Sequence, residues 1–237
     1  MKNLVKHPLI LAAIIAVFHV VAARANTAII FDTSQFWSIS TGTGVYGWQF
    51  AAQSSLEVSS LGLYDDAGNL AGGFPGNGLL ESHDIAIWDV SNPSSPLVSS
   101  IIPAGTVAPL ENGFRYVTIS PVELLAGHDY VIAATYATHD WFTGALNNPS
   151  FVATIAPQIT FEGYRENTST TLAYPGGFQS GLLEGIGPNF TFTVVPEPTV
   201  LTFTGLAAAM LFGSSKTLRR CRTNAKGVEP RSPSVRC

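Results

Sequence analysis

The chain has 237 residues, which suits one ordinary domain with terminal appendages, and a formal net charge of −4 at pH 7. Its charge is uneven: residues 26–195 hold fourteen acidic residues, two arginines and no lysine, a net charge of −12 with histidine neutral. Such an acidic segment excludes nucleic-acid binding, because affinity for phosphate backbones comes from lysine and arginine. Cys221 and Cys237 both follow this segment, so an apolar core must hold it together, without disulfides or zinc thiolates.

The first 25 residues have the pattern of a secretory signal peptide. Two lysines precede an apolar run over residues 8–23, and Ala23 and Ala25 place small side chains at the −3 and −1 positions of a signal-peptidase site. The sequence therefore predicts cleavage after Ala25 and a mature chain that begins at Asn26. A retained N-terminal membrane anchor is the alternative.

The middle of the chain has the pattern of an all-β domain. Short runs of β-branched and aromatic residues alternate with Gly, Pro, Asn and Asp clusters, which predicts an antiparallel β-sandwich of jelly-roll or Ig-like type. Alternation within these runs predicts one buried and one wet face per strand. A single helical turn is expected at Val122–Ala126. The predicted strands are Ala28–Phe31, Val45–Ala51, Leu56–Tyr64, Asp84–Val90, Leu97–Ile102, Arg115–Ile119, Tyr130–Tyr136, Phe151–Ile155, Ile159–Tyr164 and Asn189–Val194.

Four blocks within this region carry a family resemblance. They are Leu61–Asp65, Glu81–Asp89, Gly113–Val117 and Leu125–Ile132. These blocks resemble those of a β-sandwich domain of unknown function in bacterial secreted proteins. The resemblance implies a fold and no activity, since function depends on sites and not on folds.

Oxygen-bearing side chains crowd around the glycine-rich loop over residues 68–78. Calcium takes six to eight oxygen ligands, so these side chains form a candidate calcium site, and calcium is the one cofactor that the sequence suggests. Their spacing differs from that of the twelve-residue calcium loop, and turn formation and solubility are the alternative role. The candidate ligands are Asp65, Asp66, Asn69, Glu81 and Asp84.

Three His-Asp pairs, at residues 83–84, 128–129 and 139–140, raise the question of a transition-metal site. Neighbouring residues in a strand point to opposite faces, so such a pair cannot hold one ion together. We therefore expect His83, His128 and His139 to be surface histidines at strand ends.

Aromatic residues are numerous, and most are expected to pack in the core or at its rim. Exposed Trp and Tyr beside Asn and Asp can stack on sugar rings, which makes Trp141 a candidate glycan contact.

No catalytic signature stands out in the sequence. Gly177–Gly181 misses the Gly-x-Ser-x-Gly elbow by one residue and is expected to form a loop. The acidic residues include no marked pair for glycosidase chemistry. The sequence therefore predicts that the protein is not an enzyme.

The C-terminal region has three parts in a fixed order. Val195, Pro196, Glu197 and Pro198 form a rigid elbow, and an apolar stretch follows over residues 199–213. As a helix this stretch would be ~22 Å long, short of the ~30 Å hydrocarbon core, so we expect a marginal transmembrane helix over residues 199–215. The cations that follow would stay in the cytoplasm, and residues 223–237 are expected to form a disordered basic tail. These cations are Lys216, Arg219, Arg220 and Arg222.

This three-part order closely resembles the PEP-CTERM sorting signal of Gram-negative bacterial surface proteins, over Val195–Arg222. The resemblance implies recognition in the inner membrane by an exosortase, a transpeptidase-like enzyme thought to cut near the Pro-Glu-Pro motif. Residues 196–198 would then be a recognition site for chemistry that the partner performs. A plain C-terminal membrane anchor is the alternative.

Together these patterns predict a signal peptide at 1–25, an exported β-sandwich at 26–194, a sorting signal at 195–222 and a tail at 223–237. We expect a cell-surface or extracellular-matrix protein, structural or adhesive, held transiently in the inner membrane. Its expected partners are signal peptidase, an exosortase and extracellular polysaccharide, and nucleic acid is not among them. A calcium- or carbohydrate-binding module is the alternative, and an exported hydrolase the third.

Overall fold

The computed structural model describes residues 25–31, 38–40, 42–65, 77–137, 140, 142–143, 153–181 and 186–196. Within these ranges all regular structure is β-strand, and no helix there could span a membrane. The predicted transmembrane helix, and the signal peptide apart from Ala25, lie outside the described residues. The chain divides into two compact units, Met1–Val194 and Val195–Cys237.

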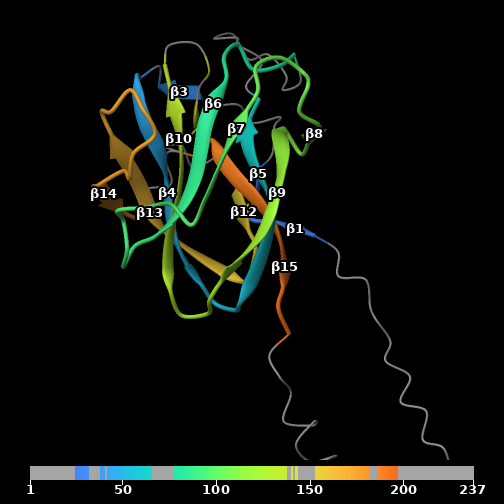
Figure 1. The fold of residues 1–237 in the computed structure, drawn as a ribbon, viewed down its shortest axis with the longest axis vertical. Helices are drawn as coiled ribbons and strands as arrows, with labels where there is room; N and C mark the ends of the chain where they lie inside the picture. The colour runs from blue at the N-terminus through green and yellow to red at the C-terminus, as the bar shows by residue number, and fades with distance from the viewer. Residues whose placement is uncertain are drawn as a thin grey trace, which may run out of the picture. The chain divides into compact units, whose positions relative to one another are not determined.

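Two large antiparallel sheets make up most of the described part of the first unit (Figure 1). The five-stranded sheet has the order β1-β15-β5-β9-β8, and the six-stranded sheet has the order β14-β13-β4-β10-β6-β7. The five-stranded sheet consists of β1 (Asn26–Thr27), β15 (Pro188–Val194), β5 (Leu56–Tyr64), β9 (Phe114–Leu124) and β8 (Leu110–Glu111). The six-stranded sheet consists of β14 (Gly177–Ser180), β13 (Ile159–Asn167), β4 (Gly44–Ala52), β10 (Asp129–Tyr136), β6 (His83–Asp89) and β7 (Val98–Ile102). Two small sheets pair β11 (Phe142–Thr143) with β3 (Ser38–Ser40) and β12 (Ala153–Ile155) with β2 (Ile29–Phe31).

Each predicted strand is confirmed over its described residues, with β9 running five residues past its predicted end at Ile119, to Leu124. Within the described part of the chain, the sequence missed strands of two to four residues, in which alternation is too short to see: β1, β3, β8, β11 and β14. The predicted helical turn at Val122–Ala126 is wrong, because β9 runs on to Leu124. Val122 and Leu124 there pair with Val58 and Leu56 of β5.

The two sheets share one apolar core, which gives the fold a β-sandwich-like arrangement. Trp48 of β4 is fully buried and stacks on Phe190 of β15, with ring centroids 6.0 Å apart. The indole Nε1–H of Trp48 also donates to the carbonyl oxygen of Pro188 at 2.8 Å, so a hydrogen bond joins the two sheets. In β15 the core face is confirmed, because Phe190 and Phe192 lie in this core, but the wet face is wrong at Thr191, which is buried at 9% exposure.

The expectation of one wet face is wrong for β6. Ile85 and Ile87 face the shared core, but Ala86 and Trp88 on the opposite side are also buried, at 0% and 2% exposure. They belong to a second apolar cluster, against which Leu172 and Tyr174 pack. The segment between β13 and β14 therefore covers this side of the sheet.

The chain enters and leaves the sandwich at the same end. In the register of β1 with β15, Asn26 lies opposite Phe192, so the start of one strand lies beside the end of the other (Figure 1). We call this the terminal end. The opposite end, where β5 and β10 finish at Tyr64 and Tyr136 and β6 begins at His83, is the loop end.

Both arginines of the acidic body are buried in its interior. Arg115 is 5% exposed and its Nε–H donates to Asp65 Oδ2 at 2.8 Å. Arg165 is 8% exposed, is hydrogen-bonded to Gln49 and lies 4.4 Å from the ring centroid of Phe178. This body has no lysine, and both of its arginines are buried. The described part of the body therefore presents no lysine or arginine side chain to solvent.

Candidate functional site

A buried pair of histidine and carboxylate lies at the loop end. His83 is 1% exposed and Asp140 is 3% exposed. His83 Nε2 lies 2.8 Å from Asp140 Oδ2, and His83 Nδ1 lies 2.6 Å from the carbonyl oxygen of Thr135. The two ring nitrogens are thus held between a carboxylate oxygen and a backbone carbonyl oxygen.

Asp140 also accepts two backbone hydrogen bonds. The N–H of Leu80 donates to Oδ1 and the N–H of Glu81 donates to Oδ2, each at 2.9 Å. Burial alone would raise the pKa of Asp140, but hydrogen bonds from His83, Leu80 and Glu81, and the charge of His83, lower this pKa below its usual 3.8. Asp140 therefore ties the segment after β10 to the turn before β6.

We expect Asp140→Asn to lower the free energy of unfolding by about 1.5–3 kcal/mol at neutral pH, since it removes charge-assisted hydrogen bonds. Because the folded pKa is depressed, this stabilisation is complete above the unfolded value near 3.8 and is lost as the pH falls through the lower folded value. Denaturant unfolding measured from pH 7 to pH 2.5 checks this. The difference in free energy of unfolding between wild type and Asp140→Asn should narrow below pH 3.8. The control Asp84→Asn, at an exposed position, should have the same free energy of unfolding as wild type across this range. A constant gap for Asp140→Asn would contradict the assignment.

Glu81 is the third member of this cluster. Ligand atoms of Glu81, His83 and Asp140 lie within 4.8 Å of one another. A Nδ1–H bond to a backbone carbonyl, as His83 has, is typical of metal-binding histidines, in which Nε2 holds the ion. A metal would here have to replace the bond between His83 and Asp140.

The predicted calcium ligands do not gather as one set. Asp65 is fully buried and accepts from Arg115 and from the N–H of Gly78 at 3.1 Å. Glu81 and Asp84 line one cavity of about 390 Å³ at the loop end, with the hydroxyl residues Thr43, Ser82, Thr135 and Thr170. Asp66 and Asn69 lie outside the described residues.

The expectation of surface histidines is wrong for His83 and confirmed for His128. His128 has a side chain 47% exposed, with Nδ1 3.5 Å from Asp89 Oδ2. His83 is buried because its partner Asp140 comes from 57 positions later in the chain, a distance that no local pattern reveals. His139 lies outside the described residues.

Two further predicted positions have different outcomes. Trp141 lies outside the described residues, so its glycan contact stays a prediction. The loop expected at Gly177–Gly181 is wrong, because residues 177–180 form the edge strand β14, exposed along its length.

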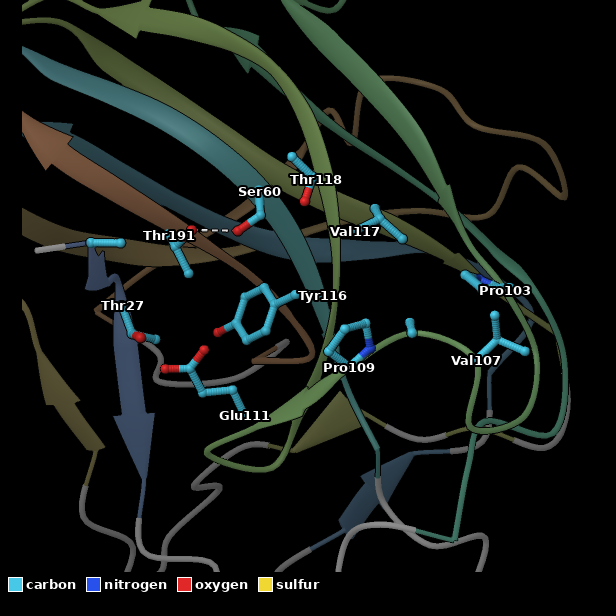
Figure 2. Close-up of a pocket in the computed structure, with 12 residues that line it drawn as sticks. Thr27, Ser60, Pro103, Val107, Pro109, Glu111, Tyr116, Val117, Thr118 and Thr191 are labelled. Atoms are coloured by element: carbon cyan, nitrogen blue, oxygen red, sulfur yellow. Dashed lines mark hydrogen bonds between the residues drawn. The ribbon is translucent and has the colours of Figure 1, made fainter.

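A second cavity, of about 450 Å³, was missed by the sequence reasoning. It lies on the five-stranded sheet beside the loop between β7 and β8 (Figure 2). Hydroxyl side chains from four strands line it, together with Tyr116 and Glu111. No spacing rule could have found it, because its residues come together only through strand register.

Compared with known protein-family models and with curated protein sequences, the chain matches none.

Proposed function

We propose that the chain is an exported bacterial cell-surface or extracellular-matrix protein with a structural or adhesive role and no catalytic one. Signal peptidase removes residues 1–25, and residues 199–215 hold the chain in the inner membrane. An exosortase then recognises residues 196–198 and transfers or releases the body, a sandwich of jelly-roll or Ig-like type. The N-terminal pattern and the three-part C-terminal order support this route.

The observation that carries the proposal is the position of the two ends of the sandwich. β1 and β15 are neighbours, with Asn26 opposite Phe192. The signal peptide before β1 and the sorting signal after β15 are therefore connected to the same end of the body. A body tethered at its terminal end leaves its loop end free for contacts. The buried His83–Asp140 and Asp65–Arg115 pairs brace that free end.

The charge of the body supports the choice of partners. Its described arginines are buried, and its remaining charge is mostly acidic. Like-charged polyanions are therefore repelled, which argues against nucleic acid and in favour of neutral or cationic surface polymers.

The sorting step is tested by replacing Pro196, Glu197 and Pro198 with alanine in a host with an active exosortase. We expect the variant to accumulate in the inner-membrane fraction as a longer chain, because the recognition site is lost. Fractionation followed by immunoblotting measures this. Replacing Pro93 and Pro96, which are exposed and outside the signal, is the matched control. Normal surface delivery of the motif variant would contradict the proposal.

A calcium-binding module is the second candidate, favoured by the cavity that Glu81 and Asp84 line with hydroxyl groups. Carboxylate and hydroxyl oxygens suit calcium, a hard cation. A calcium titration that raises the melting temperature of the protein would support this candidate, and an unchanged melting temperature would remove it.

A further inference from the structure

We infer that the cavity on the five-stranded sheet binds a neutral or amine-bearing sugar unit. The inference rests on the proposed function in one respect, because the sugar is taken to belong to polysaccharide outside the cell. The cavity measures about 450 Å³, within the range of small-molecule sites.

A row of hydroxyl side chains crosses four neighbouring strands in the cavity. In register, Thr27 of β1 pairs with Thr191 of β15, Thr191 with Ser60 of β5, and Ser60 with Thr118 of β9. Adjacent strands lie ~4.8 Å apart, so the row presents hydroxyls at regular intervals. Ser60 and Thr191 are hydrogen-bonded to each other, as Figure 2 shows. Each hydroxyl can donate once and accept twice, so the row can still bond the hydroxyls of a sugar.

Tyr116 provides a further polar group beside this row. Its side chain lies over Gly62, where a Cβ would stand 2.3 Å from Tyr116 Cε1, so only glycine lets the ring lie against the sheet. The residue is 7% exposed, and its buried hydroxyl makes no hydrogen bond of good geometry, with Thr27 as the nearest polar side chain. A hydroxyl of a ligand would give this group a well-formed hydrogen bond.

Glu111 determines which sugars the cavity accepts. Its carboxylate lies beside the phenol of Tyr116 and the side chain of Thr27 (Figure 2). Burial, and next to it the charge of Glu111, raise the pKa of Tyr116 above its usual 10, while hydrogen bonding with Thr27 lowers it. The phenol thus stays neutral and able to donate. The carboxylate favours an amine and repels the carboxylate of a uronic acid.

The remaining wall suits the C–H faces of a sugar ring. It consists of Pro103, Val107, Ala108 and Pro109 from the loop between β7 and β8. Ala25 also lines the cavity, and the predicted cleavage removes it, so the mature protein is the form to test.

The test is isothermal titration of the mature protein, purified from a host that exports and processes it, with glucose, glucosamine and glucuronate. We expect saturable binding of glucose and glucosamine, tighter for glucosamine, and none of glucuronate. Tyr116→Phe should weaken binding by about 3–10-fold, the factor of one neutral hydrogen bond. Glu111→Gln should reduce glucosamine affinity to that of glucose and leave glucose unchanged.

Glu57→Gln is the matched control, because Glu57 is an exposed carboxylate of β5 that does not line the cavity. Circular dichroism confirms that each variant is folded. Absence of saturable glucose and glucosamine binding, equal affinity for glucuronate, or wild-type affinities in both cavity variants would each overturn the inference. The sorting experiment is independent of these affinities, so the inference and the proposed function fail separately.

Discussion

Replacing Arg115 with methionine is expected to lower the free energy of unfolding by about 3–5 kcal/mol, the cost of removing one partner of a buried ion pair. Asp65 is fully buried, and Arg115 Nε donates to its Oδ2 at 2.8 Å. Arg115 Nη1 also donates to the carbonyl of Ala108 at 2.9 Å. Without Arg115, the Asp65 carboxylate is left charged and buried, with little water to solvate it.

The loss is measured by denaturant unfolding followed through tryptophan fluorescence, since Trp48 and Trp88 are both buried. Such a loss is a large part of the ~5–15 kcal/mol that holds a domain folded. The double variant Asp65→Leu with Arg115→Met should recover most of it, because an apolar pair replaces the ion pair. A single variant within 1 kcal/mol of wild type would show that the pair contributes little.

The second large effect is expected for Gly47→Ala in the centre of β4. A Cβ at position 47 would stand 2.0 Å from the carbonyl oxygen of Ile132 and 2.6 Å from Cα of Ala133. Both are backbone atoms of β10, so a side-chain rotation cannot relieve the clash and the strands must separate. We expect a loss of about 3 kcal/mol, at the upper end of overpacking effects.

Gly176→Ala is the matched control, because a Cβ at that position meets nothing within 4 Å. Its free energy of unfolding should stay within about 0.5 kcal/mol of wild type. Equal stability of the two variants in denaturant unfolding would contradict the close approach of β4 and β10.

The strands could be predicted because their signal is local. Alternation and turn residues identify β5 to the residue, and Phe190 and Phe192 as core positions, with no knowledge of tertiary contacts. The outer face of β6 could not be predicted. Trp88 is buried by a segment from beyond β13, which contributes Tyr174 at a ring-centroid distance of 6.1 Å.

The candidate sites depend on long-range pairing, and the sequence does not show it. Asp65 looked like a calcium ligand because it stands beside a glycine-rich loop, but Arg115, fifty positions later, takes its carboxylate. His83 has a nearer acidic neighbour in sequence, Asp84, but successive residues of β6 point to opposite faces, so His83 is buried and Asp84 is exposed. The hydroxyl row of Thr27, Thr191, Ser60 and Thr118 exists only in the register of four strands.

The most direct test of the export and sorting route is the intact mass of the mature protein from cells with an active exosortase. We expect a chain that begins at Asn26 and ends before the apolar stretch at residues 199–213, because in the proposed route signal peptidase and an exosortase would act at the two junctions of the body. A protein that still carries residues 1–25, or that retains Cys237, would contradict this account.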